Sequence, residues 1–145
     1  MTAHTQTAEI AELRELLRSA GLRCTTARLA VVQHLREAGS PLSHAEMAEK
    51  LVPLGFDKAT VFRNLVDLSE ARLASRTELG DHVWRFEFRE PGDPRHGNHS
   101  HFVCVECGSV TCLSDIEFDA ASQKRAAKVG RVTEVLLKGH CSRCG

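Results

Sequence analysis

The chain has 145 residues, of which 42% are hydrophobic and 26% are charged, with 19 basic and 19 acidic side chains. These proportions are typical of a globular protein and exclude the disordered and fibrous classes. No run approaches 18 apolar residues, and the first residues lack the basic start and apolar stretch of a signal peptide, so we expect a cytoplasmic protein that does not bind membranes.

Apolar periodicity and capping residues predict four helices in the first half of the chain. Gly21 and Gly39 are suited to the left-handed caps that end helices. Ser43 opens a capping box, because a glutamate follows three residues later. The four helices are expected from about Glu9 to Ala20, from Thr25 or Thr26 to Gly39, from Ser43 to near Pro53, and from Asp57 through Leu73.

A change of periodicity then predicts two strands, Leu73–Thr77 and His82–Phe88, joined by a turn. Short helices followed by a β-hairpin are the order of elements in a winged helix-turn-helix. The next stretch, 90–98, contains two prolines and two glycines and is the clearest linker in the chain. We therefore expect a winged-helix domain at 1–89 and a second domain at 99–145.

The second domain is predicted to follow a β-β-α-β order, which makes the whole chain α+β. Its elements are expected at His99–Val105, Ser109–Leu113, about Asp115–Val129, and Val132–Leu137. The core of a unit of about 50 residues is only marginally stable by itself. We therefore expect this unit to need a stabilising cross-link, a partner subunit, or both.

Four of the six cysteines form two Cys-x-x-Cys pairs, Cys104/Cys107 and Cys141/Cys144. Structural zinc is bound by four ligands in a tetrahedron, and each such turn delivers two thiolates. The pairs therefore predict a four-cysteine zinc site that joins the first strand of the second domain to its C-terminal tail. A redox dithiol or reversible disulfides would use the same residues, although the helix that usually follows a catalytic pair is missing here.

A second metal site is indicated by His99 and His101, whose spacing places both imidazoles on one face of a strand. Cys104 has the opposite parity, so the two sites are separate. Glu87 and Cys112 are the nearest candidates for further ligands. Cys112 is also compatible with a small buried hydrophobe, and Glu87 with a solvent-facing strand residue. The mid-linker His96 could also be recruited.

Charged residues are unevenly distributed along the chain. The segment from Leu13 to Arg36 contains five arginines but a single acidic residue, Glu15. This segment fits either a solvated helix face or a surface that contacts phosphate. The five arginines are Arg14, Arg18, Arg23, Arg28 and Arg36.

Three motifs together resemble the ferric uptake regulator family of metal-responsive bacterial repressors, over nearly the whole chain. Residues 21–28, GLRCTTAR, are similar to its opening G-x-R-x-T-x-x-R stretch, and 59–65, ATVFRNL, resemble its A-T-V-Y-R-x-L recognition helix. Residues 99–108, HSHFVCVECG, resemble its H-x-H-x-x-C-x-x-C-G signature, and the closing Cys-x-x-Cys matches as well.

The resemblance implies an N-terminal winged-helix DNA-binding domain, a C-terminal dimerisation domain, and a homodimer on palindromic double-stranded operator DNA. Arg63 would enter the major groove, while Arg23 and Arg28 would lie near phosphates. The other residues expected at the DNA are Thr60, Phe62 and Asn64. Phe62 departs from the family's tyrosine, so its contact would be apolar, for example with a thymine methyl group.

For the regulatory metal, the resemblance implies Glu87, His99 and His101 as ligands. Cys112 stands where the family usually has an acidic ligand, and a thiolate suits zinc better than ferrous iron or manganese. We therefore expect a zinc-responsive regulator, with iron, manganese and peroxide sensing left open. His44, near the family's further histidine, and His82 are open candidates as ligands. Asn98 and Ser100 replace the histidines of a third site found in some relatives, so none is expected.

Two other functional classes have to be weighed. One is an enzyme that uses Cys24 or the Cys-x-x-Cys pairs as nucleophiles, or a histidine-bound metal. No Ser/His/Asp arrangement, phosphate loop or H-E-x-x-H motif supports an enzyme or a small-molecule substrate. The other is a constitutive DNA-binding or zinc-ribbon module without sensing, which would tolerate loss of Glu87 and His101.

Overall fold

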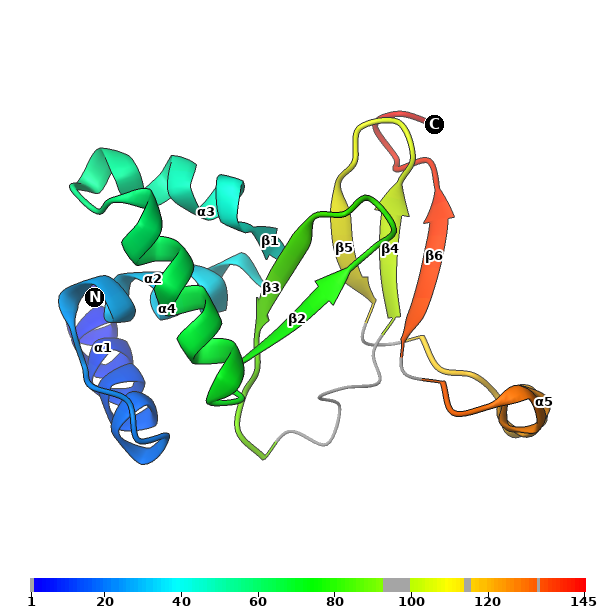
Figure 1. Ribbon diagram of the computed structural model, residues 1–145, viewed down its shortest axis with the longest axis horizontal. Coiled ribbons are helices and arrows are strands. Elements are labelled where there is room, and N and C mark those ends of the chain that lie inside the picture. Colours follow the sequence, from blue (N-terminus) through cyan, green and yellow to red (C-terminus); the bar gives the residue numbers. More distant parts are fainter. Residues whose placement is uncertain (1, 93–99, 114–115, 133) are drawn as a thin grey trace. The chain divides into compact units, whose positions relative to one another are not determined.

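The computed structural model describes residues 2–92, 100–113, 116–132 and 134–145, with side chains from residue 5 onwards (Figure 1). Two compact units, Met1–Pro91 and Gly92–Gly145, make up the chain. Both contain helices and sheets, so the fold class is α+β, as predicted. Among the described residues, no helix combines the length and the apolar character that crossing a bilayer requires.

The first unit contains the four expected helices, and polar side chains fix where three of them begin. Thr25 accepts a hydrogen bond from the backbone of Arg28, and Ser43 and Asp57 cap the next two helices in the same way. Gly39 ends the second helix with a φ of 60°. The helices are α1 (Thr2–Ser19), α2 (Thr26–Ala38), α3 (His44–Leu51) and α4 (Lys58–Glu70), with a 3-10 turn, η1, at Val52–Leu54.

A small antiparallel sheet completes this winged helix-turn-helix. Its order is β1 (Leu42–Ser43), β3 (Trp84–Phe88) and β2 (Ala74–Glu78), so the hairpin of β2 and β3 gains a third strand from the residues before α3. Phe86, from the central strand, is fully buried against the helices. The core gathers the apolar faces of all four helices, and its helical members include Leu13, Leu17, Val31, Leu35, Met47, Leu51, Val61, Leu65 and Leu68.

The second unit has the predicted β-β-α-β order. Strand β4 (Ser100–Cys104) is central, antiparallel to β5 (Val110–Leu113) and parallel to β6 (Val135–Gly139). Helix α5 (Ala120–Val129) lies between β5 and β6 in the sequence and starts after its N-cap Asp119, five residues later than expected. None of its side chains is buried.

Candidate metal and nucleic-acid sites

The two Cys-x-x-Cys turns meet at one end of the sheet of the second unit. Parallel pairing of β4 and β6 places Cys104 beside Gly139. Both strands therefore end at the same end of the sheet, and the turns that follow them contain Cys107, Cys141 and Cys144. The four sulfur atoms all lie within 4.8 Å of one another. The Cys107 and Cys141 sulfur atoms are 3.8 Å apart, which matches the edge of about 3.8 Å of a tetrahedron with zinc–sulfur bonds of about 2.3 Å. The four cysteines thus fit a structural metal ion.

The thiols of this cluster do not ionise equally. Backbone N–H groups of Cys107 and Cys141 lower the pKa of Cys104 to about 6, and backbone and thiol hydrogen bonds lower the pKa of Cys141. Hydrogen bonding to the Cys141 and Cys107 thiols raises the pKa of Cys144 to about 12. Four sulfurs this close therefore retain protons by themselves, whereas a bound dication stabilises all four thiolates.

The second unit also pairs two of the candidate regulatory ligands. His101 and Cys112 are directly opposite each other on β4 and β5, so their side chains share one face of the sheet. A ligand atom of each lies within 4.8 Å of the other. Glu134, which sequence reasoning missed, places Oε1 3.7 Å from the His101 Nδ1. Glu134 comes just before β6, so its closeness to His101 depends on the register between β4 and β6. No local sequence pattern predicts that register.

The other expected ligands are distributed differently. Glu87 is in β3 of the first unit, paired with Ser75 across the hairpin. His99 and His96 lie outside the described residues. His82 is in the hairpin turn with a φ of 61°.

Helix α4 presents an exposed face near its N-terminus. Phe62 is 43% exposed and Arg63 is exposed, while the core residues Val61 and Leu65 lie on the opposite side. Thr60 is committed to the cap, because its backbone N–H and its hydroxyl both donate to the Asp57 carboxylate. This arrangement leaves an aromatic ring and a guanidinium side by side in the sequence, which suits contact with base edges.

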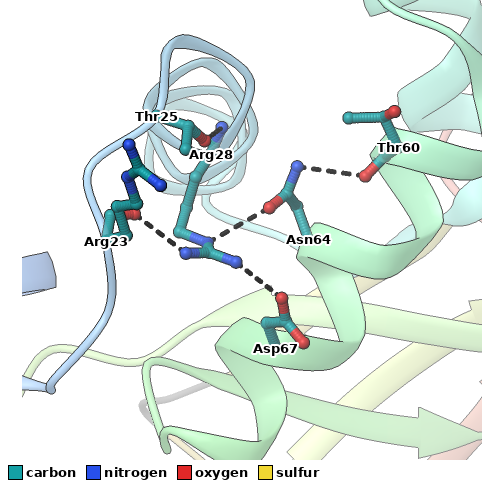
Figure 2. Close-up of polar contacts among 6 residues, drawn as sticks. All are labelled: Arg23, Thr25, Arg28, Thr60, Asn64 and Asp67. Carbon is teal, nitrogen blue, oxygen red and sulfur yellow. Dashed lines mark hydrogen bonds and ion pairs between the residues drawn. The ribbon is translucent and has the colours of Figure 1, made fainter.

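Two of the residues expected at the DNA, Arg28 and Asn64, make contacts between α2 and α4 (Figure 2). Asn64 is only 6% exposed, and its amide donates to the Thr60 carbonyl of its own helix. Arg28 reaches across from α2 to Asn64 and Asp67. Sequence reasoning could have found the burial of Asn64, since Asn64 is three residues after Val61 and therefore shares the buried face of α4. Arg23, by contrast, is exposed.

The remaining candidates have structural contacts within the first unit. His44 is hydrogen-bonded through Nε2 to the Lys58 carbonyl at 2.9 Å, and its ring meets that of Phe62 edge-on at 5.2 Å. It therefore supports the start of α4. Cys24 is half-buried and packs against the core of the first unit.

Comparison with known families identifies the family of the chain. The model of the "Ferric uptake regulator family" matches residues 19–137, which include the helix-turn-helix, the histidine motif and the first cysteine pair. The chain belongs to this family.

Relatives support the assignment over most of the chain. The ferric uptake regulation protein of Bacillus subtilis (strain 168) is 32% identical over 146 residues, covering 93% of both chains. Its counterpart in Escherichia coli (strain K12) is 31% identical over 132 residues, covering 87% of this chain and 86% of the relative. The crystal structure of the Vibrio cholerae ferric uptake regulator aligns with a TM-score of 0.68 and 26% identity, covering 88% of this chain and 98% of that one.

Membership of the ferric uptake regulator family makes the chain a metal-responsive, DNA-binding transcription regulator. Regulators of this family act as dimers. The four clustered cysteines of the second unit could hold a metal ion.

Proposed function

We propose that the chain is a zinc-responsive repressor of metal homeostasis genes, which binds a palindromic operator as a homodimer. In this proposal 1–89 is the DNA-binding domain, 90–98 a hinge, and 99–145 the dimerisation and metal-binding domain. The protein acts by binding and has no catalytic role. The observation that carries the choice of metal is the pairing of His101 with Cys112 across β4 and β5.

A thiolate in that position changes which metal is preferred. Imidazole and thiolate ligands suit zinc, whereas carboxylate ligands suit manganese and other hard cations. We assign Glu87, His99, His101 and Cys112 to the regulatory site, with the four paired cysteines holding a separate structural zinc. A divalent cation bound at the regulatory site would link ligands from both sides of the hinge. It would therefore favour one arrangement of the DNA-binding domains.

The switch has to meet a thermodynamic requirement. Shifting an equilibrium from 1:99 to 99:1 requires about 5.5 kcal/mol of differential binding. Binding linkage is reciprocal, so operator DNA should tighten regulatory metal binding by the same factor by which the metal tightens DNA binding. Structural rearrangement of the DNA-binding domains is what the crystal structure of the Vibrio cholerae relative reveals, which supports a mechanism of this kind.

The dimer is supported by apolar side chains that a single second unit leaves exposed. Ile116 and Phe118 precede α5, Val129 ends it at 94% exposure, and Val132 follows. Exposed apolar patches of this kind mark protein interfaces. We assign them to the contact between two copies, which brings two recognition helices to two half-sites of an operator.

Metal identity is tested by competition. Protein holding only its structural zinc is titrated with Zn²⁺, Fe²⁺ or Mn²⁺ while affinity is measured for a duplex that wild-type protein selects from a random library. We expect Zn²⁺ to restore binding at the lowest free concentration. Restoration by Fe²⁺ or Mn²⁺ at free concentrations where Zn²⁺ has no effect would reassign the protein to iron or manganese sensing.

A further inference from the structure

Arg28 connects three segments of the winged helix through a single side chain (Figure 2). Its Nη1 donates to the backbone carbonyl of Arg23 at 2.8 Å, its Nε to the Asn64 side chain at 3.1 Å, and its Nη2 to the Asp67 carboxylate at 2.6 Å. The first partner lies in the segment that leads into α2, and the other two lie on α4. One guanidinium therefore joins the Arg23 segment to the recognition helix.

The environment of Arg28 distinguishes it from a residue that contacts DNA. Its side chain is 13% exposed, and its charge is balanced by Asp67 at ion-pair distance. A phosphate approaching this guanidinium would also meet the carboxylate of Asp67. Arg23 and Arg63 are both exposed, so their side chains are accessible to phosphates and bases.

Asn64 extends the connection along α4. Its carbonyl oxygen accepts from Arg28, while its amide nitrogen donates to the Thr60 carbonyl one turn earlier. Thr60 in turn is bound to the N-cap Asp57. The chain of contacts thus runs from Arg28 to the first turn of the recognition helix, where Phe62 and Arg63 are exposed. A pocket of about 300 Å³ is lined by residues of both helices, among them Arg28, Arg63 and Asn64.

We propose that Arg28 is a positioning residue for operator recognition: it sets the Arg23 segment and helix α4 relative to each other and does not itself neutralise a phosphate. This inference rests on the proposed function, since it assigns a role within DNA binding. The family resemblance alone would place Arg28 near phosphates, so the two roles make different predictions.

Salt dependence separates the two roles. The logarithm of the DNA-binding constant falls with the logarithm of salt concentration by about 0.9 for each neutralised phosphate. In a dimer, loss of one phosphate contact per protomer therefore reduces the slope by about 1.8. A positioning residue lowers affinity at every salt concentration and leaves the slope unchanged, because no counterion release is lost.

The test measures Kd at several salt concentrations for metal-loaded, full-length protein and the library-selected duplex, with variants Arg28→Gln, Arg28→Lys and Asp67→Asn. We expect both Arg28 variants to bind the duplex about tenfold more weakly with an unchanged salt slope. Arg28→Lys should not restore DNA affinity, because a compact ammonium group cannot donate hydrogen bonds to three differently placed acceptors. Arg125→Gln on α5, outside the winged helix, is the charge-matched control, because its side chain is exposed, and it should retain wild-type affinity.

Asp67→Asn gives the sharpest contrast. If Arg28 positions α4, loss of its carboxylate partner weakens DNA binding. If Arg28 neutralises a phosphate, the same change removes a nearby negative charge, frees the guanidinium and tightens binding. Tighter binding by Asp67→Asn, a shallower slope for Arg28→Gln, or full rescue by Arg28→Lys would each overturn the proposal.

Two controls keep the result interpretable. Stoichiometric titration gives the active fraction of each variant, so partial unfolding is counted separately from affinity. The ratio of specific to non-specific binding should also fall for Arg28→Gln, which uniform destabilisation would leave unchanged. Failure of wild-type protein to select any duplex would count against the proposed function itself and is distinguishable from failure of the variants.

Discussion

Cys104 on β4 and Gly139 on β6 are register partners in parallel strands, so both Cys-x-x-Cys turns leave the sheet at the same end. The crossover through α5 makes this parallel pairing possible and brings together residues more than thirty positions apart in the sequence. Without a cation, the four sulfurs resist simultaneous ionisation, as the opposite pKa shifts of Cys104 and Cys144 indicate. A metal ion therefore contributes to folding of the second unit as well as to its chemistry.

Removal of the structural metal should unfold the second unit. Cys107→Ser is expected to lower the metal content by one ion per chain, and both this change and exhaustive chelation should abolish cooperative unfolding of 100–145. Structural zinc supplies about 10–16 kcal/mol in small zinc peptides, which is comparable to the whole stability of a domain. Elemental analysis and amide hydrogen exchange measure the two effects.

Cys24→Ser is the matched control for that experiment. Cys24 packs against the core of the first unit, so its loss should leave the metal content unchanged. A Cys107→Ser protein with full metal content and native exchange protection in 100–145 would contradict the assignment.

Local sequence chemistry predicted much of the fold because it acts over a few residues. Thr25, Ser43 and Asp57 are N-caps where the sequence predicts helix starts, since each side chain accepts from a backbone N–H three residues later. The β-β-α-β order was likewise predicted from periodicity. The two-residue strand β1 was missed, because its support is the pairing of Leu42 and Ser43 with the distant strand β3.

The candidate sites could be predicted where the ligands are closely spaced in the sequence, as in the Cys-x-x-Cys pairs. They could not be predicted where a contact depends on the packing of residues far apart in the sequence. The cysteine spacing was sufficient to predict the four-cysteine cluster. The inward orientation of Arg28 depends on Asp67, 39 residues later, and the approach of Glu134 to His101 depends on the register of β6. Neither relationship has a local sequence signal.

The regulatory site should lose its thiolate when Cys112 is changed. With cobalt substituted for zinc, Cys112→Ser is expected to remove the sulfur-to-metal charge-transfer band of the second, weaker site. The bands of the four-cysteine site should persist, because its four sulfurs are untouched. Absorption spectra during stepwise cobalt addition follow both sites. His101→Ala should abolish the weaker site altogether, and an unchanged second step in both variants would remove these residues from the ligand set.

Arg63 should contribute to sequence recognition. Arg63→Ala is expected to cost about 1–3 kcal/mol of operator binding and to relax selectivity at one base pair of each half-site. Phe62→Tyr retains the ring and should stay within a few fold of wild-type affinity. Binding to a set of single-substitution duplexes measures both. Uniform weakening across every duplex would instead make Arg63 a phosphate contact.

The cap of the recognition helix should respond to acid. The backbone N–H of Thr60 and its hydroxyl lower the pKa of Asp57 below its usual 3.8. A folded-state pKa below the unfolded value stabilises the fold above the unfolded pKa, and this contribution is lost as pH falls through the folded value. Asp57→Asn retains the cap at pH 7 and should flatten the decrease in thermal stability below about pH 4. Equal acid sensitivity in both proteins would contradict this origin.

A second metal, bound apart from the four-cysteine cluster, is expected to control DNA affinity. The most direct measurement is operator affinity as a function of zinc equivalents, in wild-type protein and in Glu87→Ala/His101→Ala. One equivalent of zinc per chain should fold the protein without strong DNA binding, and the second should raise affinity by about tenfold or more in the wild type alone. Equal affinity at one and two equivalents, or a double variant that switches like wild type, would contradict it.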